Sequence, residues 1–425
     1  MSKIKIGLIG LGTVASGVYK TLQDFDNIEI VKIAVRDINK PRNIENLDKS
    51  LLTTDSMSIV NDKNIDVVVE LIGGVEPAKT LITTAILNGK HVVTANKELL
   101  AKHGEELFEL AEKNNKVILY EGAIAGGIPL IMPIKTILSA NKISKIEAIL
   151  NGTTNYILTN MDMKHASYDD VLKEAQELGY AEADPTADVE GFDAAYKLAT
   201  LATISLNKRI KINDVYREGI SKVTAEDIKY ANELGYKIKL VAHAELTDDN
   251  TADVRVHPMF VSKNTTLAHI DYVTNAVTIT GFPIGQVTLS GPGAGEFPTA
   301  SSVAGDIVVL SNEIGTTDYI LPMMRCSHSG SVKVTDIKDT INKYYLSLTV
   351  SNKVGVIGKI GLICAEKGIS LASVLQKGVS EDNTANIIII TELCKERDIL
   401  EVIDLLEKEG CINKLNSMIR VAKDV

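Results

Sequence analysis

The stretch of sequence most informative about chemistry is a run of acidic residues that ends in a lysine. Between residues 175 and 197 lie Glu182, Asp184, Asp188, Glu190, Asp193 and Lys197. A new helix is predicted from about Asp188, so Asp193 and Lys197, four residues apart, share one helical face. Such a pair is usually a solvated salt bridge, but the residues around it are apolar. We therefore expect a half-buried lysine, held by carboxylates, that donates a proton or orients a substrate.

A glycine-rich loop near the N-terminus predicts a dinucleotide site. A predicted strand, Lys5–Ile9, runs into Gly10-Leu11-Gly12, and a helical pattern follows. Gly10 permits a tight turn, Gly12 lets the backbone approach a pyrophosphate at the helix N-terminus, and Ala15 is an accepted variant of the third glycine. The expected cofactor contacts are Gly10, Leu11, Gly12, Thr13, Val14, Arg36, Gly73 and Lys97.

The end of the second predicted strand bears on which dinucleotide binds. Val35-Arg36-Asp37 follows the glycine loop by about 25 residues, near the position that reads the ribose. An acid such as Asp37 suits the 2′-hydroxyl of NAD, whereas Arg36 suits the 2′-phosphate of NADP, with Lys40 adding charge. The sequence favours NADP and leaves NAD open, and a solvated strand end is the alternative interpretation.

Strand-like and helical patterns alternate around these motifs, which predicts an α/β fold with a Rossmann-type doubly wound parallel sheet. The expected strands are Lys5–Ile9, Ile28–Val35, Val67–Leu71, His91–Thr94 and Val117–Tyr120. We assign residues 1–130 to this dinucleotide-binding domain. Residues 299–320, with a helix at Ala300–Asn312, are expected to return to it. The stretch Gly122–Pro129 is typical of a flexible joint.

The rest of the chain predicts two more parts. Residues 131–298 are expected to form an α+β domain for substrate binding and dimerisation, with helices at Tyr168–Leu178 and Ala187–Leu206. A linker at residues 321–340 leads to residues 341–425, whose order is strand, helix, strand, strand, helix, strand. That βαββαβ order is the ferredoxin-like split βαβ unit.

Composition excludes several classes of function. The net charge is −10 and there is no Trp, whereas nucleic-acid surfaces are basic and often stack bases on aromatic rings. No apolar stretch reaches the length of a bilayer and no signal peptide precedes the first predicted strand, so we expect a cytoplasmic protein without a membrane partner. The cysteines lack metal-ligand spacing and are expected to be reduced thiols. They are Cys326, Cys364, Cys394 and Cys411.

Together these motifs resemble those of the homoserine dehydrogenases. The run from Ala175 to Lys197 matches the family's pattern A-x3-G-aromatic-small, followed by D-P-x2-D-aliphatic-x-G-x-D-x3-K. Residues 94–97 (Thr-Ala-Asn-Lys), 151–158 and 291–295 also resemble family segments, and the C-terminal unit resembles an ACT domain. The resemblance covers essentially the whole chain. It implies the reversible, NAD(P)-dependent reduction of L-aspartate 4-semialdehyde to L-homoserine, a step in threonine and methionine biosynthesis.

The resemblance also implies roles for single residues. Lys197 is the expected proton donor, Asp193 holds it, and Lys97 is a second active-site lysine. Glu182 is expected to take the substrate ammonium, with Asp188 and Thr153 on the same substrate side. These roles agree with the chemistry, because hydride addition to an aldehyde builds negative charge on oxygen, which an ammonium group stabilises and protonates.

Two further sites are implied in the same way. A monovalent cation, Na⁺ or K⁺, is expected at Glu121 and the main-chain carbonyls of Ile124, Gly126 and Ile128, unless Glu121 only caps a strand end. In the ACT domain, Gly355 lies in the first strand–helix turn, where an effector such as L-threonine is expected. The usual Asp and Pro of that turn are Asn352 and Val354, so a packing or dimerisation module without a ligand stays open.

The assembly and two other functions are left open by the sequence. We expect a homodimer or a higher homo-oligomer, because closed symmetric dimers are the commonest assemblies. One alternative function is a related dehydrogenase of another amino acid or amino aldehyde. The other is a nonenzymatic redox or amino-acid sensor, which would need an output element that the sequence does not display and would not need Lys97 or Lys197.

Overall fold

The structure is a computed structural model that describes residues 3–314, 330–378 and 383–423. The chain divides into two compact units. The first is formed by Met1–Ile146, Asp193–Val215 and Thr274–Val332, and the second by Glu147–Phe192, Tyr216–Val273 and Lys333–Val425. Within the described residues, no helix is long and apolar enough to cross a membrane.

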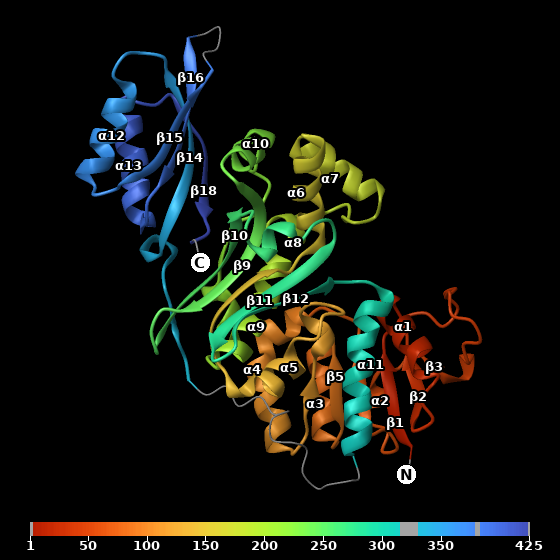
Figure 1. Ribbon diagram of the computed structural model, residues 1–425. Helices are drawn as coiled ribbons and strands as arrows, with labels where there is room; N and C mark the ends of the chain where they lie inside the picture. The colour runs from red at the N-terminus through yellow and green to blue at the C-terminus, as the bar shows by residue number, and fades with distance from the viewer. Residues whose placement is uncertain (1–2, 315–329, 379–382, 424–425) are drawn as a thin grey trace. The chain divides into compact units, whose positions relative to one another are not determined.

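A six-stranded parallel sheet forms the centre of the first unit (Figure 1). Its strand order is β3-β2-β1-β4-β5-β6, the order of dinucleotide-binding Rossmann folds, and the predicted fold class is confirmed. The strands are β1 (Ile4–Ile9), β2 (Ile28–Ala34), β3 (Leu52–Thr53), β4 (Val67–Glu70), β5 (His91–Thr94) and β6 (Ile118–Leu119). All four residues of β4 are buried, as expected for a central strand covered on both faces. Only the two-residue β3 was not predicted.

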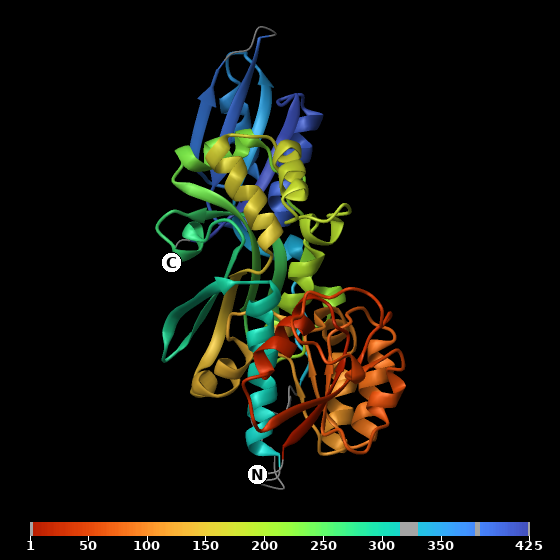
Figure 2. The ribbon, with the colours of Figure 1, turned by 90° about the vertical axis from the view of Figure 1, so that its right-hand side faces the viewer.

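Helices cover both faces of this sheet (Figure 2). On one face, α1 (Thr13–Leu22) and α11 (Glu296–Glu313) share a core with β1, β4 and β5. The other face carries α2 (Met57–Val60), α3 (Ala78–Leu87) and α4 (Lys97–Lys113). Gly17 lets α1 and α11 approach closely, because a Cβ at that position would lie 2.8 Å from the Cβ of Ala300. The helix predicted at Ala300–Asn312 is therefore present, and it begins earlier, at Glu296.

The segment Gly122–Pro129, expected to be a flexible joint, is packed instead. The N–H of Gly127 donates to the carbonyl of Pro292 at 3.1 Å, and Ser302 Oγ donates to the carbonyl of Gly126 at 2.6 Å. Gly126 has a φ of 57°, and a Cβ there would collide with the carbonyl of Gly293. The prediction of flexibility was wrong because these glycines serve a left-handed turn and close packing.

The first unit also contains α5 (Ile131–Lys135), α9 (Phe192–Leu206) and the antiparallel strands β11 (Thr274–Phe282) and β12 (Gly285–Pro292). The single helix predicted over Ala187–Leu206 is wrong. The chain forms α8 (Thr186–Val189) and then α9, because Gly191 has a φ of 77° and interrupts the helix. The boundary between the units also falls inside β7 (Lys142–Ile149).

The second unit has a mixed sheet whose strands run β9-β10-β18-β14-β16-β15. Here β9 (Tyr236–Leu246) and β10 (Thr251–Ser262) form a long antiparallel pair. The short strands β8 (Tyr216–Arg217) and β13 (Lys333–Val334) pair with β10. The helices of this part are α6 (Gly152–Lys164), α7 (Tyr168–Glu177), α8 and α10 (Ala225–Glu233).

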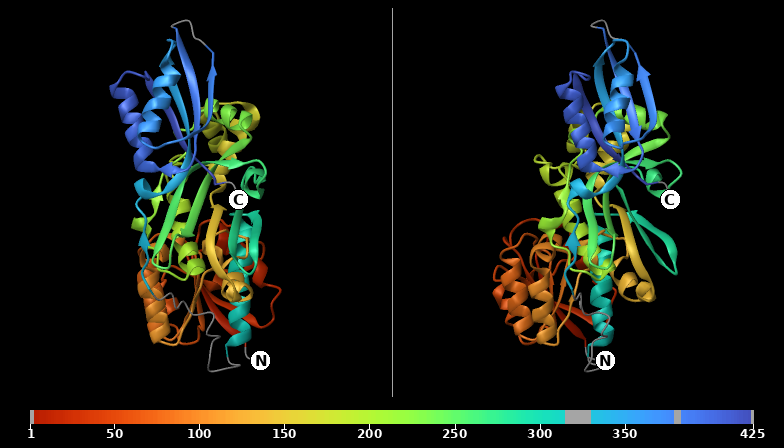
Figure 3. Two further views of the ribbon diagram at one scale, coloured as in Figure 1. Left: turned by 60° about the vertical axis from the view of Figure 1, so that its left-hand side comes forward. Right: turned by 90° about the vertical axis from the view of Figure 1, so that its left-hand side faces the viewer.

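The C-terminal part of the second unit confirms the βαββαβ prediction. Its main elements are β14 (Ile341–Ser351), α12 (Val356–Glu366), β15 (Leu371–Lys377), β16 (Thr384–Thr391), α13 (Glu396–Lys408) and β18 (Lys414–Val421), with the short β17 (Cys394–Lys395) before α13. Both α12 and α13 lie on one face of the sheet (Figure 3) and share its core. Three of the cysteines, Cys364, Cys394 and Cys411, are free thiols, whereas Cys326 lies outside the described residues.

A buried ion network joins this C-terminal part to the rest of the second unit. Arg420, in β18, is only 2% exposed. Its guanidinium donates to both carboxylate oxygens of Glu396, at 2.6 and 2.7 Å, and to Glu218 at 2.8 Å. Because Glu218 follows β8 and Glu396 begins α13, one arginine connects three elements.

Candidate active site

Two lysines and one aspartate meet in the first unit. Asp193 lies in the first turn of α9 and Lys197 one turn further along, and the Lys197 Nζ is 2.7 Å from Asp193 Oδ2. Lys97, the first residue of α4, contacts the other oxygen, Oδ1. The side chains of Asp193 and Lys197 are 7% and 10% exposed, whereas that of Lys97 is 41% exposed. The structure thus brings together the three residues predicted to be catalytic.

The electrostatics of this group keep the aspartate ionised. Burial by itself would raise the pKa of the Asp193 carboxyl, but the ammonium groups of Lys197 and Lys97 outweigh burial and hold that pKa well below its ordinary value. Two ammonium groups therefore share one carboxylate. The excess positive charge is suited to stabilising an oxyanion that forms beside it.

A polar chain that the sequence interpretation missed places Lys97 at the start of α4. Asn96 caps that helix by accepting from the N–H of Leu99, and its side-chain amide donates to the carbonyl of Gly74 at 2.7 Å. Thr94 Oγ1 accepts from the N–H of Asn96 and donates to the buried Glu70 at 2.6 Å. The only sequence signals were the acid that ends an apolar strand and the residues preceding Lys97.

The glycine loop has the geometry of a pyrophosphate site. Gly10 has a φ of 101°, which favours glycine, and a Cβ there would lie 3.0 Å from the carbonyl of Leu71. Gly12 precedes α1, and a Cβ at Gly12 would meet nothing within 4 Å. Since no side chain caps the first turn of α1 in the described chain, Thr13 and Val14 can offer their N–H groups to an anion.

A cavity of about 520 Å³ lies beside this loop. Its lining includes Gly10, Leu11, Gly12, Arg36, Asp37, Lys40, Arg42 and Gly73. Five of the eight predicted cofactor contacts therefore line one cavity, and Thr13 and Val14 follow it directly in α1. The eighth, Lys97, lies with Asp193 instead.

The residues predicted on the substrate side belong to the second unit. Asn151 caps α6, and its side-chain amide donates to Asp188 Oδ1 at 2.7 Å. Thr153 Oγ1 donates to the carbonyl of Tyr180 at 2.8 Å. Glu182 is exposed, and its carboxylate makes no ion pair within the described residues. These contacts join the start of α6 to α8 and to the loop before α8.

Glu121 is a buried helix cap. Its Oε1 accepts from the N–H groups of Leu130 and Ile131 at 2.5 and 2.9 Å, and its Oε2 accepts from Met132 at 2.8 Å. It therefore caps α5 and not a strand end. A second buried carboxyl, Asp306, accepts from the N–H of Glu121 at 2.8 Å. Burial, reinforced by the charge of Glu121, raises the pKa of Asp306 well above its ordinary value.

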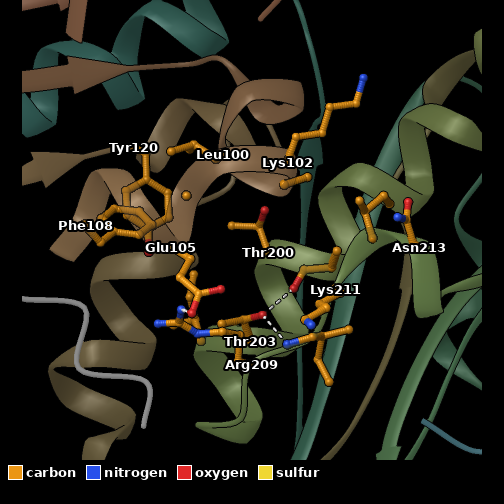
Figure 4. A pocket seen from close by; sticks show the side chains of 16 residues that line it. Leu100, Lys102, Glu105, Phe108, Tyr120, Thr200, Thr203, Arg209, Lys211 and Asn213 are labelled. Carbon is orange, nitrogen blue, oxygen red and sulfur yellow. Dashed lines mark hydrogen bonds and ion pairs between the residues drawn. The ribbon is translucent and has the colours of Figure 1, made fainter. Parts of the chain in front are cut away.

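A second cavity of the first unit, of about 270 Å³, lies between α4 and α9 (Figure 4). It is lined by Leu100 on α4 and Thr200 on α9, each three residues beyond an active-site lysine. At its edge, Arg209 pairs with Glu105 of α4. Thr203 Oγ1 donates to the carbonyl of Ala199 at 2.7 Å and accepts from the N–H of Ile210 at 3.1 Å. Thr203 thus ties the segment after α9 to that helix, and Arg209 ties the same segment to α4.

A third cavity, of about 280 Å³, surrounds Gly355. Gly355 has a φ of 90° and precedes α12. Asn352, Val354 and Gln376 are among the residues that line this cavity. The predicted effector glycine therefore lies in a hollow at the first strand–helix turn of the C-terminal module.

Three protein-family models match the chain. Residues 10–121 match the NAD binding domain of homoserine dehydrogenase, residues 129–308 match homoserine dehydrogenase, and residues 344–411 match the ACT domain. The homoserine dehydrogenase of Synechocystis sp. is 42% identical over 98% of this chain and 99% of its own length.

Solved structures agree with these matches. A homoserine dehydrogenase from Thiobacillus denitrificans is 38% identical with a TM-score of 0.93, and the match covers 100% of this chain and 99% of that one. A hyperthermophilic archaeal homoserine dehydrogenase in complex with NADPH is 27% identical with a TM-score of 0.63, over 73% of this chain and 98% of that one.

The matches extend over all three predicted parts of the chain, including both lysines of the site. They do not favour the sensor or the dehydrogenase of another amino acid. The chain therefore belongs to the homoserine dehydrogenase family, and it is a nicotinamide-dependent oxidoreductase.

Proposed function

We propose that this chain interconverts L-aspartate 4-semialdehyde and L-homoserine, with Lys197 as the proton donor. The observation that carries the proposal is the buried carboxylate of Asp193 held between Lys97 and Lys197. When bound, the reduced nicotinamide supplies a hydride to the aldehyde carbon. The carbonyl π electrons move to oxygen, and Lys197 gives that oxygen a proton and is later reprotonated from solvent.

The difference in burial between the two lysines favours Lys197 as the donor. Its side chain is 10% exposed, against 41% for Lys97. An ammonium shielded from water stabilises a developing alkoxide more strongly than an exposed one. Lys97 then adds positive charge and holds the second oxygen of Asp193, so that Asp193 keeps Lys197 in place.

The loop after β2 supports NADP as the preferred cofactor. Arg36 and Lys40 line the cavity of the glycine loop, and neither side chain makes a hydrogen bond or ion pair within the described chain. Asp37 Oδ1 already accepts from the N–H of Asn39 at 2.8 Å. Two free cations suit a 2′-phosphate, whereas a carboxylate occupied within its own loop is less suited to a ribose hydroxyl. The NADPH complex of the archaeal relative agrees with this preference.

On the substrate side, Glu182 is proposed to bind the substrate ammonium, with Asp188 and Thr153 shaping the surrounding loop. Glu182 is exposed, so its carboxylate is available to bind a cationic group. The hydrogen bonds from Asn151 to Asp188 and from Thr153 to Tyr180 support an orienting role for that loop.

A monovalent cation at Glu121 and the carbonyls of Ile124, Gly126 and Ile128 is a further proposal. Glu121 and Asp306 place two carboxyl groups in one buried region, which supplies oxygen atoms that a cation would bind. The three N–H donors to Glu121 use only part of the accepting capacity of a carboxylate. Its role would be structural.

For regulation and assembly, we propose that the hollow at Gly355 takes an amino acid, L-threonine by preference, and that the chain forms a homodimer or a higher homo-oligomer. The cavity volume and the left-handed glycine before α12 support a small ligand.

The test is a steady-state assay of aspartate semialdehyde reduction with NADPH and NADH in parallel, each with and without threonine. Lys197→Met is expected to lower kcat by about 10²- to 10⁴-fold, the range for a lost general acid, and Lys97→Met by less. Dinucleotide binding, followed by nicotinamide fluorescence, checks that the variants are folded. A near-normal rate in Lys197→Met with intact dinucleotide binding would reject the assignment.

A further inference from the structure

The loop that follows β2 is held together by one arginine that the sequence interpretation did not select. Arg42 lines the same 520 Å³ cavity as Arg36 and Lys40. Its NH2 group donates to the carbonyl of Asp37 at 2.7 Å, and its NH1 group donates to the carbonyls of Lys40 at 2.9 Å and Ile38 at 3.4 Å. The Arg42 guanidinium therefore donates hydrogen bonds to three backbone carbonyls, all from the five residues that precede it.

These hydrogen bonds determine the conformation of the loop that carries the side chains of Arg36 and Lys40. The chain from Asp37 to Lys40 turns around the guanidinium, and the hydrogen bond from the N–H of Asn39 to Asp37 closes the turn from the other side. Arg36 directly precedes this turn and Lys40 ends it. Among the described residues, the Asp37–Asn39 contact is the other hydrogen bond that holds the backbone of this loop.

The positive charge of Arg42 is also not neutralised by an acidic partner within the described residues. Its hydrogen-bond acceptors are neutral backbone carbonyls, and it forms no ion pair within the described chain. The fork of the guanidinium suits this task, because its planar N–H groups point to fixed positions, whereas a lysine ammonium is a single point charge on a flexible stem.

We propose that Arg42 is a positioning residue for cofactor selectivity, which holds the Asp37–Lys40 loop so that Arg36 and Lys40 meet the 2′-phosphate of NADP. The inference rests on the proposed preference for NADP. It predicts that Arg42 acts through the shape of the loop rather than through its charge alone.

The experiment compares Arg42→Met, Arg42→Lys and Arg36→Met in the full-length enzyme, with Lys63→Met as the control. Lys63 is an exposed lysine of the same unit that does not line the cavity. The KM values for NADPH and NADH are measured for each variant. We expect Arg42→Met to raise the KM for NADPH about tenfold or more, the size of a lost set of charged hydrogen bonds, with a smaller change for NADH. The control should change neither value.

Two measurements separate positioning from direct contact. Arg42→Lys keeps the charge and loses the fork, so a KM for NADPH close to that of Arg42→Met supports positioning, and one close to wild type overturns it. Hydrogen exchange of the Asn39 amide in the cofactor-free enzyme gives the second readout. Positioning predicts faster exchange in both Arg42 variants and an unchanged rate in Arg36→Met. Unchanged exchange in the Arg42 variants would overturn the inference.

The design also distinguishes this inference from the proposal on which it rests. If the wild-type enzyme shows no preference for NADPH and Arg36→Met has no effect on it, the NADP proposal itself fails. If the preference exists and depends on Arg36 but not on Arg42, only the positioning role fails.

Discussion

Replacing Asp193 by asparagine tests the central group of the site most directly. The substitution keeps the size of the side chain and removes its charge. In the structure this carboxylate contacts two ammonium groups, with a Lys197 Nζ–Oδ2 distance of 2.7 Å. The variant would therefore remove the carboxylate that faces the ammonium of Lys197, which is 10% exposed, in a region closed to water.

The exposure of each lysine sets the expected magnitude. Removing one partner of a buried ion pair destabilises a protein by about 3–5 kcal/mol, because the remaining charge is uncompensated. The Lys97 contact, whose lysine is 41% exposed, adds only about 0.2–1 kcal/mol. The loss is therefore dominated by Lys197.

A matched control is available in α13. Asp404 and Lys408 have the same residue types and the same spacing, at 2.6 Å, but their side chains are 58% and 68% exposed. Asp404→Asn is expected to change the free energy of unfolding by no more than about 0.5 kcal/mol. The contrast isolates burial from residue type.

The pH dependence gives a second readout. Asp193 has a folded pKa below its ordinary value of 3.8, so its contribution to stability is complete above about pH 5 and is lost progressively as the pH falls from there towards the folded pKa. Asp193→Asn should thus lower stability at neutral pH, with the difference shrinking in acid. Loss of the carboxylate also favours the neutral form of a buried amine, so the alkaline limb of the kcat profile should move to lower pH.

The measurements are denaturant unfolding at pH 7 and at pH 3, and kcat for aspartate semialdehyde reduction between pH 6 and 11, on wild type and both variants. If Asp193→Asn unfolds like Asp404→Asn and its alkaline limb coincides with that of wild type, the two lysines do not depend on Asp193, and the reasoning is wrong.

The remaining predictions concern packing, the ion network and the cation. Gly126→Ala should destabilise the first unit by more than about 1 kcal/mol, because the left-handed turn and the nearby carbonyl of Gly293 exclude a Cβ. Thermal unfolding checks this against Gly305→Ala, a position inside α11 where a Cβ meets nothing within 4 Å and where alanine should not lower stability. Arg420→Met should lower the free energy of unfolding by about 3–5 kcal/mol, because it leaves the buried Glu396 without its ion-pair partner. Limited proteolysis of the C-terminal module should then be faster than in wild type. Equal rates of proteolysis would contradict the role of the network. Exchange of K⁺ and Na⁺ for tetramethylammonium at constant ionic strength should lower the midpoint of thermal unfolding of wild type but not of Glu121→Gln. Equal shifts in the two proteins would contradict the proposed cation site at Glu121.

Local patterns in the sequence were sufficient for much of the fold. The apolar run at Val67–Val69 lies within a predicted strand that the structure confirms as β4, and the βαββαβ order of the C-terminal part was predicted correctly. Both signals are short-range, since they depend on the repeat of apolar residues along one element. Where a single glycine changed the backbone, the pattern failed. Gly191 divides the predicted helix at 187–206, and Gly126 packs a segment that was predicted to be flexible.

The sequence by itself determined the type of chemistry, because the glycine loop and the Asp193–Lys197 spacing each act through neighbours a few residues away. Only the tertiary structure decided which groups share that chemistry. It placed Lys97, almost a hundred residues from Asp193, on the second carboxylate oxygen, and it buried Lys197 more deeply than Lys97. It also assigned Glu121 to a helix cap and Arg42 to the loop beside the cofactor cavity. Burial and the meeting of distant side chains depend on packing between elements, which no local pattern records.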